Sequence, residues 1–465
     1  MKDSGRLEST LDILALHGTD KKPLDQVVHG YFKTRRYIGA KDRQAISATV
    51  YGVMRHRASC DWWALERGLS PLLMNAYDAG RIRLLAYLWL FEKVARDKIG
   101  ILFSGEKYAP EKLSDKECSI FEKLPDLKTL PPWVEGEYPE WLFPLLKRRF
   151  GENLKKEIQA FLEQASLDLR VNTLKGTREE ALKSLEQTGL VVAPTQLSPW
   201  GLRIKGRENI TQTKAFQDGL VEVQDEGSQL IVNLMDVQPA QTVLDLCAGA
   251  GGKTLALAAL LQNKGRVVAT DTAAWRLKRT KERLKRAGAF NVELREINGV
   301  NDKWLKRQKE RFDRVLVDAP CSGSGTWRRN PDQKWNIKRE DIQELSELQT
   351  TLLEGAAQFV KPGGILVYAT CSLLCEENED VVYAFLEKHP NFILIPCGLG
   401  GAPFLSLSPL QNGTDGFFAA KFERAPHPPL APHVATSPTR REVIKTTSPL
   451  VGEVAPKGRV RGITK

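Results

Sequence analysis

The chain has 465 residues, of which 42% are hydrophobic and 27% are charged, so it is long enough for about two to four domains of ordinary size. No run of about eighteen uncharged apolar residues occurs, which excludes a transmembrane helix. The first residues also lack the apolar segment of a signal peptide. We therefore expect a soluble, cytoplasmic protein with no membrane partner.

The formal net charge is +11, and its distribution limits what can be concluded from it. Residues 425–465 carry seven Lys and Arg against two Glu, which accounts for +5 and leaves +6 on the rest of the chain. This excess suits a polyanionic partner, but it does not distinguish RNA from DNA or an acidic membrane.

From about Leu7 to Leu102, apolar residues recur at helical spacing, and an irregular segment with several prolines follows. We expect residues 1–135 to form a helical domain with a linker. Basic residues gather here, either as a solvated helix face or as an RNA-contacting surface on which Tyr31, Phe32 and Tyr37 could stack on bases. These basic residues are Lys33, Arg35, Arg36, Lys41, Arg43, Arg55, His56 and Arg57.

Residues 136–235 are expected to form a small α+β module that binds RNA. A helix carrying Lys147, Arg148 and Arg149 opens it. The expected elements that follow are strands at 169–173, 190–192, 201–204 and 220–223 and a helix over 178–187.

Residues 236–424 alternate strands with helices, which predicts a mainly parallel, doubly wound α/β sheet. The expected strands are 242–246, 266–271, 292–296, 314–318, 365–370, 392–395 and 417–422. The expected helices are 253–261, 274–287, 341–360 and 376–388. The tail, residues 425–465, is rich in Pro, Ser and Thr and is expected to be a disordered basic tail.

A strand, a glycine-rich turn and a helix start are predicted over Val243–Thr254 (VLDLCAGAGGKT). Such a turn lets backbone amides approach a ligand closely, but it is a weak signal and lacks the spacing of a dinucleotide fingerprint or a P-loop. The next strand ends in Asp271, which could accept hydrogen bonds from both ribose hydroxyls of a nucleoside or, alternatively, cap the following helix. Asp245 could position an amino group or brace the loop. The combination suits S-adenosylmethionine at least as well as NAD.

Seven cysteines are present, an odd number with no Cys-x-x-Cys pair, which argues against a disulfide framework and against a metal site. Cys60, Cys118, Cys247 and Cys397 are expected to be unreactive, as small apolar side chains usually are. Cys321 and Cys371 differ, because each follows an apolar run that predicts a buried strand. Ligands of open α/β sheets bind at the carboxyl ends of strands, so we expect both thiols in one crevice.

Two thiols with Asp318 three residues before the first suggest covalent chemistry on a pyrimidine base. A thiolate that adds to C6 makes C5 nucleophilic toward a sulfonium methyl group, and loss of the C5 proton then expels the thiol. Asp318 is the nearest candidate to contact N3 of cytosine. Because a base inside a duplex cannot be reached, the substrate must be single-stranded or flipped RNA.

The segment from Asp245 to Glu379 resembles the Nop/Sun family of RNA cytosine-5 methyltransferases. The matching stretches are 246–254 (LCAGAGGKT), 312–326 (FDRVLVDAPCSGSGT), 328–332 (RRNPD), 370–372 (TCS) and 415–418 (DGFF). Residues 1–424 resemble the branch that acts on bacterial ribosomal RNA, and the helical region is similar to the antitermination factor NusB. The resemblance implies a Rossmann-like class I methyltransferase domain. It also implies that Cys371 is the nucleophile and that Cys321 assists product release, an order that the residues alone leave open.

The family's cofactor contacts carry over to the glycine loop and to three acidic or basic positions. These residues are Cys247, Ala248, Gly249, Ala250, Gly251, Gly252, Lys253, Asp271, Arg276 and Asp318. Three positions depart from the family pattern. At two of them, Ala250 and Cys375 stand where proline is usual. Asn298 stands where an aspartate usually contacts the adenine, and its amide can still bind the adenine edge.

The favoured hypothesis is a monomeric enzyme that forms 5-methylcytosine in small-subunit (16S) ribosomal RNA. One alternative keeps the chemistry but acts on transfer RNA. Another is an RNA-binding assembly or antitermination factor with a vestigial catalytic domain. A methyltransferase of small molecules would not explain two thiols or the positive charge.

Overall fold

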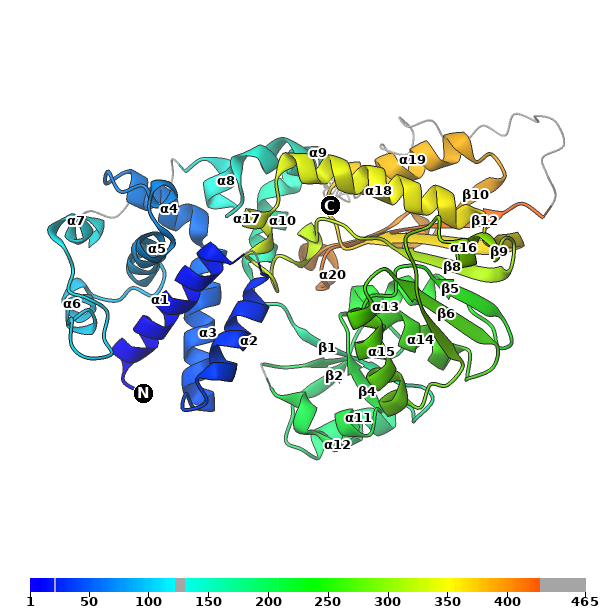
Figure 1. Cartoon of the computed structure of the whole chain (residues 1–465), viewed down its shortest axis with the longest axis horizontal. Coiled ribbons are helices and arrows are strands. Elements are labelled where there is room, and N and C mark those ends of the chain that lie inside the picture. The colour runs from blue at the N-terminus through cyan, green and yellow to red at the C-terminus, as the bar shows by residue number, and fades with distance from the viewer. Residues whose placement is uncertain (21, 122–129, 207, 427–465) are drawn as a thin grey trace, which may run out of the picture.

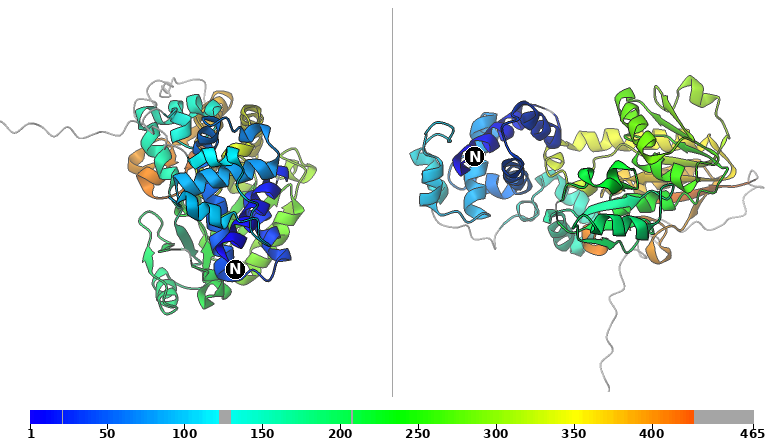
Figure 2. Two further views of the ribbon diagram at one scale, coloured as in Figure 1. Left: turned by 90° about the vertical axis from the view of Figure 1, so that its left-hand side faces the viewer. Right: turned by 90° about the horizontal axis from the view of Figure 1, so that it is seen from below.

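The computed structural model describes residues 1–20, 22–121, 130–206 and 208–426. From residue 427 onward, the predicted disordered tail lies outside the described residues. The described chain forms a helical N-terminal domain, a small sheet module and a larger mixed sheet with helices on both faces (Figure 1). Seen from below, the helical domain lies to one side of the sheets (Figure 2).

A buried apolar core joins the helices of the N-terminal domain, and Leu11, Ile13 and Leu85 are fully buried in it. Asn75 begins one of these helices as an N-cap, because its side chain accepts a hydrogen bond from the Asp78 amide at 2.9 Å. The helices are α1 (Asp3–Thr19), α2 (Leu24–Thr34), α3 (Ala40–Arg55), α4 (Arg57–Leu65), α5 (Ala76–Leu90), α6 (Arg96–Leu102) and α7 (Asp115–Cys118). The predicted helical character of this region is confirmed.

The aromatic residues of α2 belong to this core. Tyr31 and Phe32 are only 4% and 8% exposed, so the prediction that they stack on bases is wrong. Both lie on the apolar face of the helix with Val27 and Val28, and this packing outweighs any external role. Tyr37, in contrast, is 77% exposed.

Hydrogen bonds fix the N-terminal domain against the loop that follows Cys321. Arg55 donates to the carbonyl oxygens of Leu162 at 3.2 Å and Arg328 at 3.0 Å. Asp332 accepts a hydrogen bond from the Leu24 amide at 3.1 Å, at the start of α2. Arg55 is therefore a structural residue of the junction rather than part of an exposed basic surface.

Residues 132–162 pack on the large sheet domain. Their buried side chains, such as Leu146 and Phe161, share a core with Trp327 and Leu373. The helices are α8 (Pro132–Glu135), α9 (Phe143–Phe150) and α10 (Leu154–Leu162). The carboxylate of Glu137, only 2% exposed, accepts the amides of Ala58 and Ser59 at 2.8 and 3.2 Å and so caps α4.

The small module is an antiparallel four-stranded sheet in the order β2-β3-β1-β4. Its strands are β1 (Leu167–Val171), β2 (Val192–Pro194), β3 (Gly201–Ile204) and β4 (Val221–Val223), and its helices are α11 (Arg178–Glu186) and α12 (Lys214–Gln217). Thr177 and Glu180 form a capping box that starts α11. The four predicted strands are present, although the first two are displaced by about two residues.

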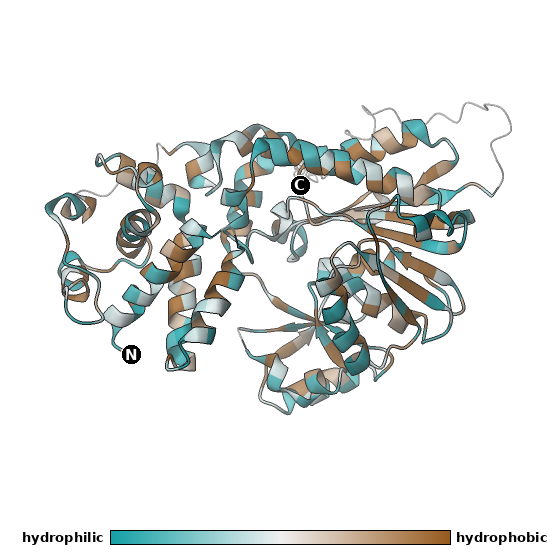
Figure 3. Ribbon diagram, in the orientation of Figure 1, coloured by the Kyte–Doolittle hydropathy of each residue, from teal (hydrophilic) through white to brown (hydrophobic). Residues whose placement is uncertain are grey.

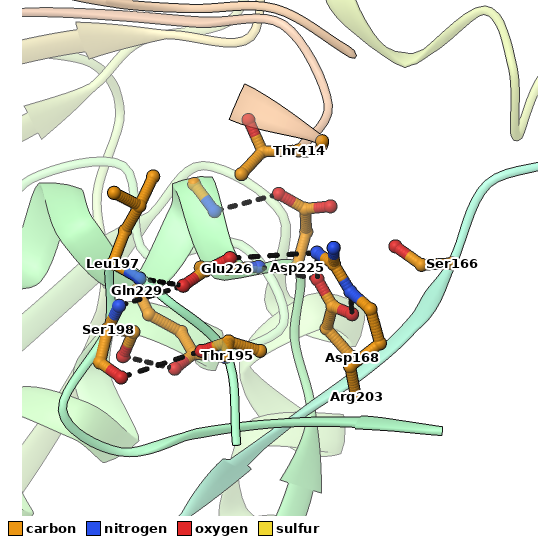
Figure 4. A network of polar contacts seen from close by, with 12 residues as sticks. Ser166, Asp168, Thr195, Leu197, Ser198, Arg203, Asp225, Glu226, Gln229 and Thr414 are labelled. Atoms are coloured by element: carbon orange, nitrogen blue, oxygen red, sulfur yellow. Dashed lines mark hydrogen bonds and ion pairs between the residues drawn. The ribbon is translucent and has the colours of Figure 1, made fainter. Parts of the chain in front are cut away.

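A buried polar network joins this module to α13 (Glu226–Asn233), as Figure 4 shows. The two carboxylate oxygens of Asp168 accept hydrogen bonds from Nε and Nη2 of Arg203 at 2.7 and 2.8 Å. Glu226 accepts the amides of Leu197 and Ser198 at 2.6 and 2.8 Å. Because these carboxylates are almost fully buried and hydrogen-bonded, the module cannot turn relative to α13 without leaving charges unpaired.

The large sheet has the order β10-β12-β9-β8-β5-β6-β7, and β11 pairs with β12. Strands β9, β8, β5, β6 and β7 are parallel, while β12 is antiparallel to β9 and β10. The strands are β5 (Thr242–Asp245), β6 (Arg266–Asp271), β7 (Val292–Glu296), β8 (Phe312–Asp318), β9 (Val360–Thr370), β10 (Phe392–Ile395), β11 (Leu405–Leu407) and β12 (Phe417–Arg424). The predicted mainly parallel, doubly wound sheet is confirmed, and β11 is an addition that its three residues did not signal.

Helices cover both faces of this sheet, as Figure 1 shows. The helices of this part of the chain are α14 (Gly252–Leu260), α15 (Ala274–Ala287), α16 (Lys303–Lys306), α17 (Gln333–Asn336), α18 (Arg339–Ala357), α19 (Glu379–Lys388) and α20 (Pro409–Asn412), and those packed on the sheet include α14, α18 and α19. Val315 and Val317 of β8 pack in the core under α18 and α19, whereas Leu316 packs in the core under α13 and α14. This alternation buries both faces and produces the continuous apolar runs seen in the sequence. Among the described residues, no helix has the length and apolar character to cross a membrane.

Replacing Glu137 with alanine should lower the free energy of unfolding of the N-terminal domain by about 2 kcal/mol, because two buried amides at the start of α4 would lose their acceptor. Calorimetry should detect this as a lower transition temperature. Glu135→Ala is the matched control, since it removes only a surface ion pair with Lys155 and should change stability by less than about 1 kcal/mol. Equal effects of the two substitutions would contradict the capping role.

Candidate active site

Two thiols meet at the carboxyl edge of the sheet. Strands β8 and β9 are parallel neighbours, and Asp318 lies opposite Ala369 at their ends. The loops that follow bring the sulfur atoms of Cys321 and Cys371 to 3.4 Å from each other, within hydrogen-bond distance. The prediction that both thiols share one crevice is therefore confirmed.

The surroundings of Cys321 disfavour its ionisation. The pKa of Cys321 lies well above its usual value because its hydrogen bond with Cys371 and its burial favour the protonated form, and the nearby charge of Glu377 adds to this effect. The surroundings of Cys321 therefore favour its neutral thiol form.

A buried carboxylate holds both thiol loops in place. Glu377, fully buried, belongs to the short 3-10 helix Cys375–Glu377. It accepts hydrogen bonds from the amide and hydroxyl of Ser322 at 2.8 and 2.5 Å, from the amide group of Gln349 at 2.9 Å, and from the Ser372 hydroxyl. Ser322 directly follows Cys321, and Ser372 directly follows Cys371. One carboxylate thus links the two loops, a role that the sequence analysis missed.

The glycine-rich turn adopts backbone conformations that favour glycine. Gly249 and Gly251 have φ of +56° and +80°. A Cβ atom on Gly251 would lie 2.4 Å from Cγ2 of Thr280, whereas one on Gly249 would meet no atom within 4 Å. Gly251 therefore permits close packing against α15, while Gly249 borders open space in which a ligand can approach the backbone.

Asp271 braces this turn from the end of β6. Its two carboxylate oxygens accept the amides of Gly249 and Ala273 at 2.9 and 2.8 Å. The N-cap position of α15 is Ala273, so Asp271 is not the N-cap. A carboxylate can accept about four hydrogen bonds, and two acceptor positions therefore remain for ribose hydroxyls.

Asp245 offers an acceptor with no partner among the described residues. Its Oδ2 accepts the Thr254 hydroxyl at 2.7 Å, but the buried Oδ1 has no hydrogen bond. Burial raises the pKa of Asp245 to about 7, and the charge of Asp318 contributes in the same direction. An unpartnered carboxylate oxygen beside an open glycine turn fits the cationic amino group of an amino-acid cofactor.

Lys253 connects the cofactor turn to the thiol loop. Its ammonium group donates to Asp318 at 2.6 Å. The side chain of Asp318 is 31% exposed, so a ligand in the cleft can still reach it. The structure thus brings together the turn, Asp271, Asp318 and the thiols.

Other predicted site residues occupy more peripheral positions. Arg276 is 48% exposed in its side chain and lies 3.8 Å from Asp271. Asn298 is exposed just after β7, where its backbone N–H donates to the Asp302 carboxylate at 3.2 Å. Burial and the nearby charge of Asp245 hold the pKa of Cys247 far above its usual value, in agreement with an unreactive thiol. The contacts of Arg276 and Asn298 with a cofactor remain predictions.

Cys375 belongs to a different environment. It is 9% exposed and interacts with Arg149 and Glu379, and burial raises its pKa to about 11. It is therefore not an additional thiol of the reactive pair.

A cleft of about 610 Å³ opens beside Cys321 and Ser322. Pro23 of the N-terminal domain lines it together with residues of α17 and α18 such as Gln333 and Leu345. The helical domain thus contributes part of the wall beside the reactive pair. Among the described residues there is no cluster of His, Cys, Asp and Glu suited to a metal ion.

Comparison with known proteins identifies the family. A family profile described as 16S rRNA methyltransferase RsmB/F matches residues 232–423, and an RsmF/B-like, ferredoxin-like domain profile matches residues 138–211. The ribosomal RNA small subunit methyltransferase B of Serratia proteamaculans is 37% identical over 407 residues, which cover 83% of this chain and 92% of the relative. The chain belongs to the RsmB/F methyltransferase family. The predicted resemblance is thereby confirmed, and the protein is a methyltransferase that uses S-adenosylmethionine.

Two further similar proteins match nearly the whole chain. The probable ribosomal RNA small subunit methyltransferase B of Synechocystis sp. is 29% identical over 454 residues, covering 91% of this chain and 98% of the relative. The protein in the crystal structure titled PH0851 is 30% identical in sequence, and its fold matches with a TM-score of 0.77. The match covers 91% of this chain and 99% of that chain. The similarity therefore includes the N-terminal domain as well as the methyltransferase sheet.

The raised pKa of Asp245 predicts that S-adenosylmethionine binds more weakly as the pH falls. Asp245 must lose its proton to pair with the cofactor's amino group, so affinity should drop about tenfold between pH 8 and pH 6. Calorimetry in two buffers of different ionisation enthalpy should detect proton release on binding near pH 6.

Asp245→Asn should bind more weakly, with little of this pH dependence. Without cofactor, the contribution of Asp245 to stability should fall as the pH rises from about 4 to about 7, because the folded protein retains a proton that the unfolded chain has lost. An unchanged pH profile in Asp245→Asn would contradict this assignment.

Proposed function

We propose that the protein methylates C5 of a cytosine in 16S ribosomal RNA through a covalent intermediate on Cys371. The observation that carries the proposal is the pair of sulfur atoms 3.4 Å apart, at strand ends next to a cofactor turn. Transfer to an oxygen or an exocyclic nitrogen would need no such pair, whereas C5 must first be activated by addition at C6.

The raised pKa of Cys321 fits a role in product release and leaves Cys371 as the nucleophile that the family resemblance implies. At 3.4 Å either sulfur could donate the hydrogen bond, and we propose that Cys321 donates it to Cys371. A hydrogen bond from a neighbouring thiol stabilises the Cys371 thiolate, which is the reactive form of cysteine. The order of the two roles thus comes from the family resemblance, and the distance between the thiols is compatible with it.

The reaction then follows from these positions. The Cys371 thiolate forms a bond to C6, and the electron pair displaced toward C5 takes the methyl group that S-adenosylmethionine supplies when bound. C5 then loses its proton to solvent, and the C6–sulfur bond breaks. Cys321 donates its hydrogen bond to the departing Cys371 thiolate, which makes that sulfur a better leaving group.

Asp318 is placed to orient the base. It precedes Cys321 by three residues at the end of β8, and its partly exposed carboxyl group lies between the lysine of the cofactor turn and the thiol loop. We propose that it contacts N3 of the cytosine, while Lys253 holds the carboxyl group in position.

Relatives named for ribosomal RNA support that substrate over transfer RNA. Exposed basic residues of the N-terminal domain support an RNA partner, and Pro23 of that domain lines the cleft beside Cys321. These exposed residues are Lys33, Arg36 and Lys41. The paired thiols and the buried network that fixes them disfavour a vestigial catalytic domain.

Substitution of each thiol should separate their roles. Cys371→Ala should abolish methyl transfer from labelled cofactor to RNA, because C6 would have no nucleophile. Cys321→Ala should accumulate a covalent protein–RNA adduct on denaturing gels, because the departing thiolate would lose its hydrogen-bond donor. Cys375→Ala is the matched control and should retain activity, since that thiol packs against Arg149 outside the site. An adduct in Cys371→Ala would refute the assigned nucleophile.

The substrate can be identified by bisulfite sequencing of ribosomal and transfer RNA from a strain that lacks the protein. We expect one or a few cytosines of 16S ribosomal RNA to lose protection, because the methyl group at C5 protects cytosine from deamination. Restoration by the wild-type chain but not by Cys371→Ala would tie the change to catalysis. Loss confined to transfer RNA would favour the alternative substrate.

A further inference from the structure

One helix of the methyltransferase domain carries an exposed basic face that the catalytic site does not use. This helix, α15, begins three residues after Asp271 at the cofactor turn and ends against the small module. Figure 3 shows it as a hydrophilic helix in front of the large sheet. Four of its exposed cations form no ion pair with any described residue, and Glu282 is the only acidic residue of the helix. These cations are Lys278, Arg279, Lys281 and Lys285.

Two other cations of the same helix, Arg283 and Arg286, are structural, and Arg276 faces Asp271 at the cofactor turn. Arg283 and Arg286 both pair with Glu222, whose side chain is 3% exposed. Arg283 also donates to the carbonyl of Ala250 in the cofactor turn, and the Arg286 guanidinium lies 4.0 Å from the centre of the Phe216 ring. The fold therefore accounts for these two arginines but not for the four cations on the outer face.

The exposed basic face continues onto the small module. Asn172 donates to the carbonyl of Ala287 at 2.8 Å and thereby fixes the module against the end of α15. The exposed Lys175 follows in the same loop, and its ammonium group would lie 3.3 Å from a Cβ atom placed on Gly288. One rigid surface thus joins Lys175 to the cations of α15.

Exposed aromatic rings stand at both ends of this surface. Trp275, 57% exposed, precedes the first cation, and its ring lies 5.4 Å from the Arg276 guanidinium. Phe290, 81% exposed, follows the helix. Aromatic rings beside cations are characteristic of surfaces that bind single-stranded nucleic acid, where bases stack and phosphates pair.

We propose that the outer face of α15 and Lys175 bind the backbone of the RNA substrate outside the catalytic cleft. This inference rests on the proposed RNA substrate and adds the path of the strand, from the cofactor edge toward the small module. Lys278 and Lys285 are about 10 Å apart along the helix axis, which is the length of about three stacked nucleotides. A face so rich in charge suits a polyanion better than an apolar protein surface.

The test measures how salt affects binding of a short single-stranded RNA of mixed sequence to the full chain. The double variant K278Q/K281Q should lower the slope of log K against log salt concentration by about 1.4, because each phosphate contact to a single strand contributes about 0.7. At about 0.1 M salt this corresponds to roughly 25-fold weaker binding. Cofactor affinity should stay unchanged, since neither lysine contacts the cofactor turn.

The matched control is R96Q/K98Q, which removes two exposed charges from α6 in the N-terminal domain. If α15 binds RNA, this control should keep the wild-type slope. Equal slopes for K278Q/K281Q and wild type would overturn the proposal and indicate another partner for the face, such as an acidic protein. Failure of the proposed function itself is distinguishable, because the wild-type chain would then transfer no methyl group to RNA.

Discussion

The catalytic geometry depends on one buried carboxylate. Glu377 accepts hydrogen bonds from Ser322 and Ser372, which follow the two thiols, and from Gln349 of α18. Separating the loops would leave a buried charge without partners, at a cost of several kcal/mol. The 3.4 Å contact between Cys321 and Cys371 is therefore held by the residues that follow the two thiols. The same charge also contributes to the raised pKa of Cys321.

The loop after Cys321 extends this constraint to the whole molecule. Arg328 and Arg329 both bind the carboxylate of Asp415, and Arg329 also donates to Asp225 at 2.8 Å, just before α13. Asp332 of the same loop caps α2 in the N-terminal domain. Three parts of the chain are thus oriented by the segment that carries one of the reactive thiols, so a shift of the N-terminal domain would be transmitted to the site.

The sequence predicted best those residues whose place in the fold follows from the local pattern of apolar and polar side chains. Apolar runs that end in Asp271, Asp318 and Thr370 predict strands with these ends, because parallel strands are buried on both faces. Because these strands are parallel, their ends then lie at the same carboxyl edge of the sheet. Glu377 could not be found this way, since its partners lie 5 to 55 residues away along the chain and only tertiary packing brings them together. The short strand β11 was missed because a segment of three residues is too short to show the alternation of apolar and polar side chains that predicts a strand.

The roles of the basic residues could not be predicted from composition, because net charge does not separate structural cations from exposed ones. Arg55 donates to backbone carbonyls at a domain junction, and Arg283 and Arg286 neutralise a buried glutamate. Such cations are engaged within the protein and contribute little to counterion release when a polyanion binds. Exposed cations that form no ion pair within the described part of the chain, such as Lys278 and Lys281, retain their full electrostatic interaction with a phosphate backbone. The affinity for RNA should therefore depend on a small, spatially defined subset of the positive charges, and its salt dependence should count the members of that subset rather than the formal net charge.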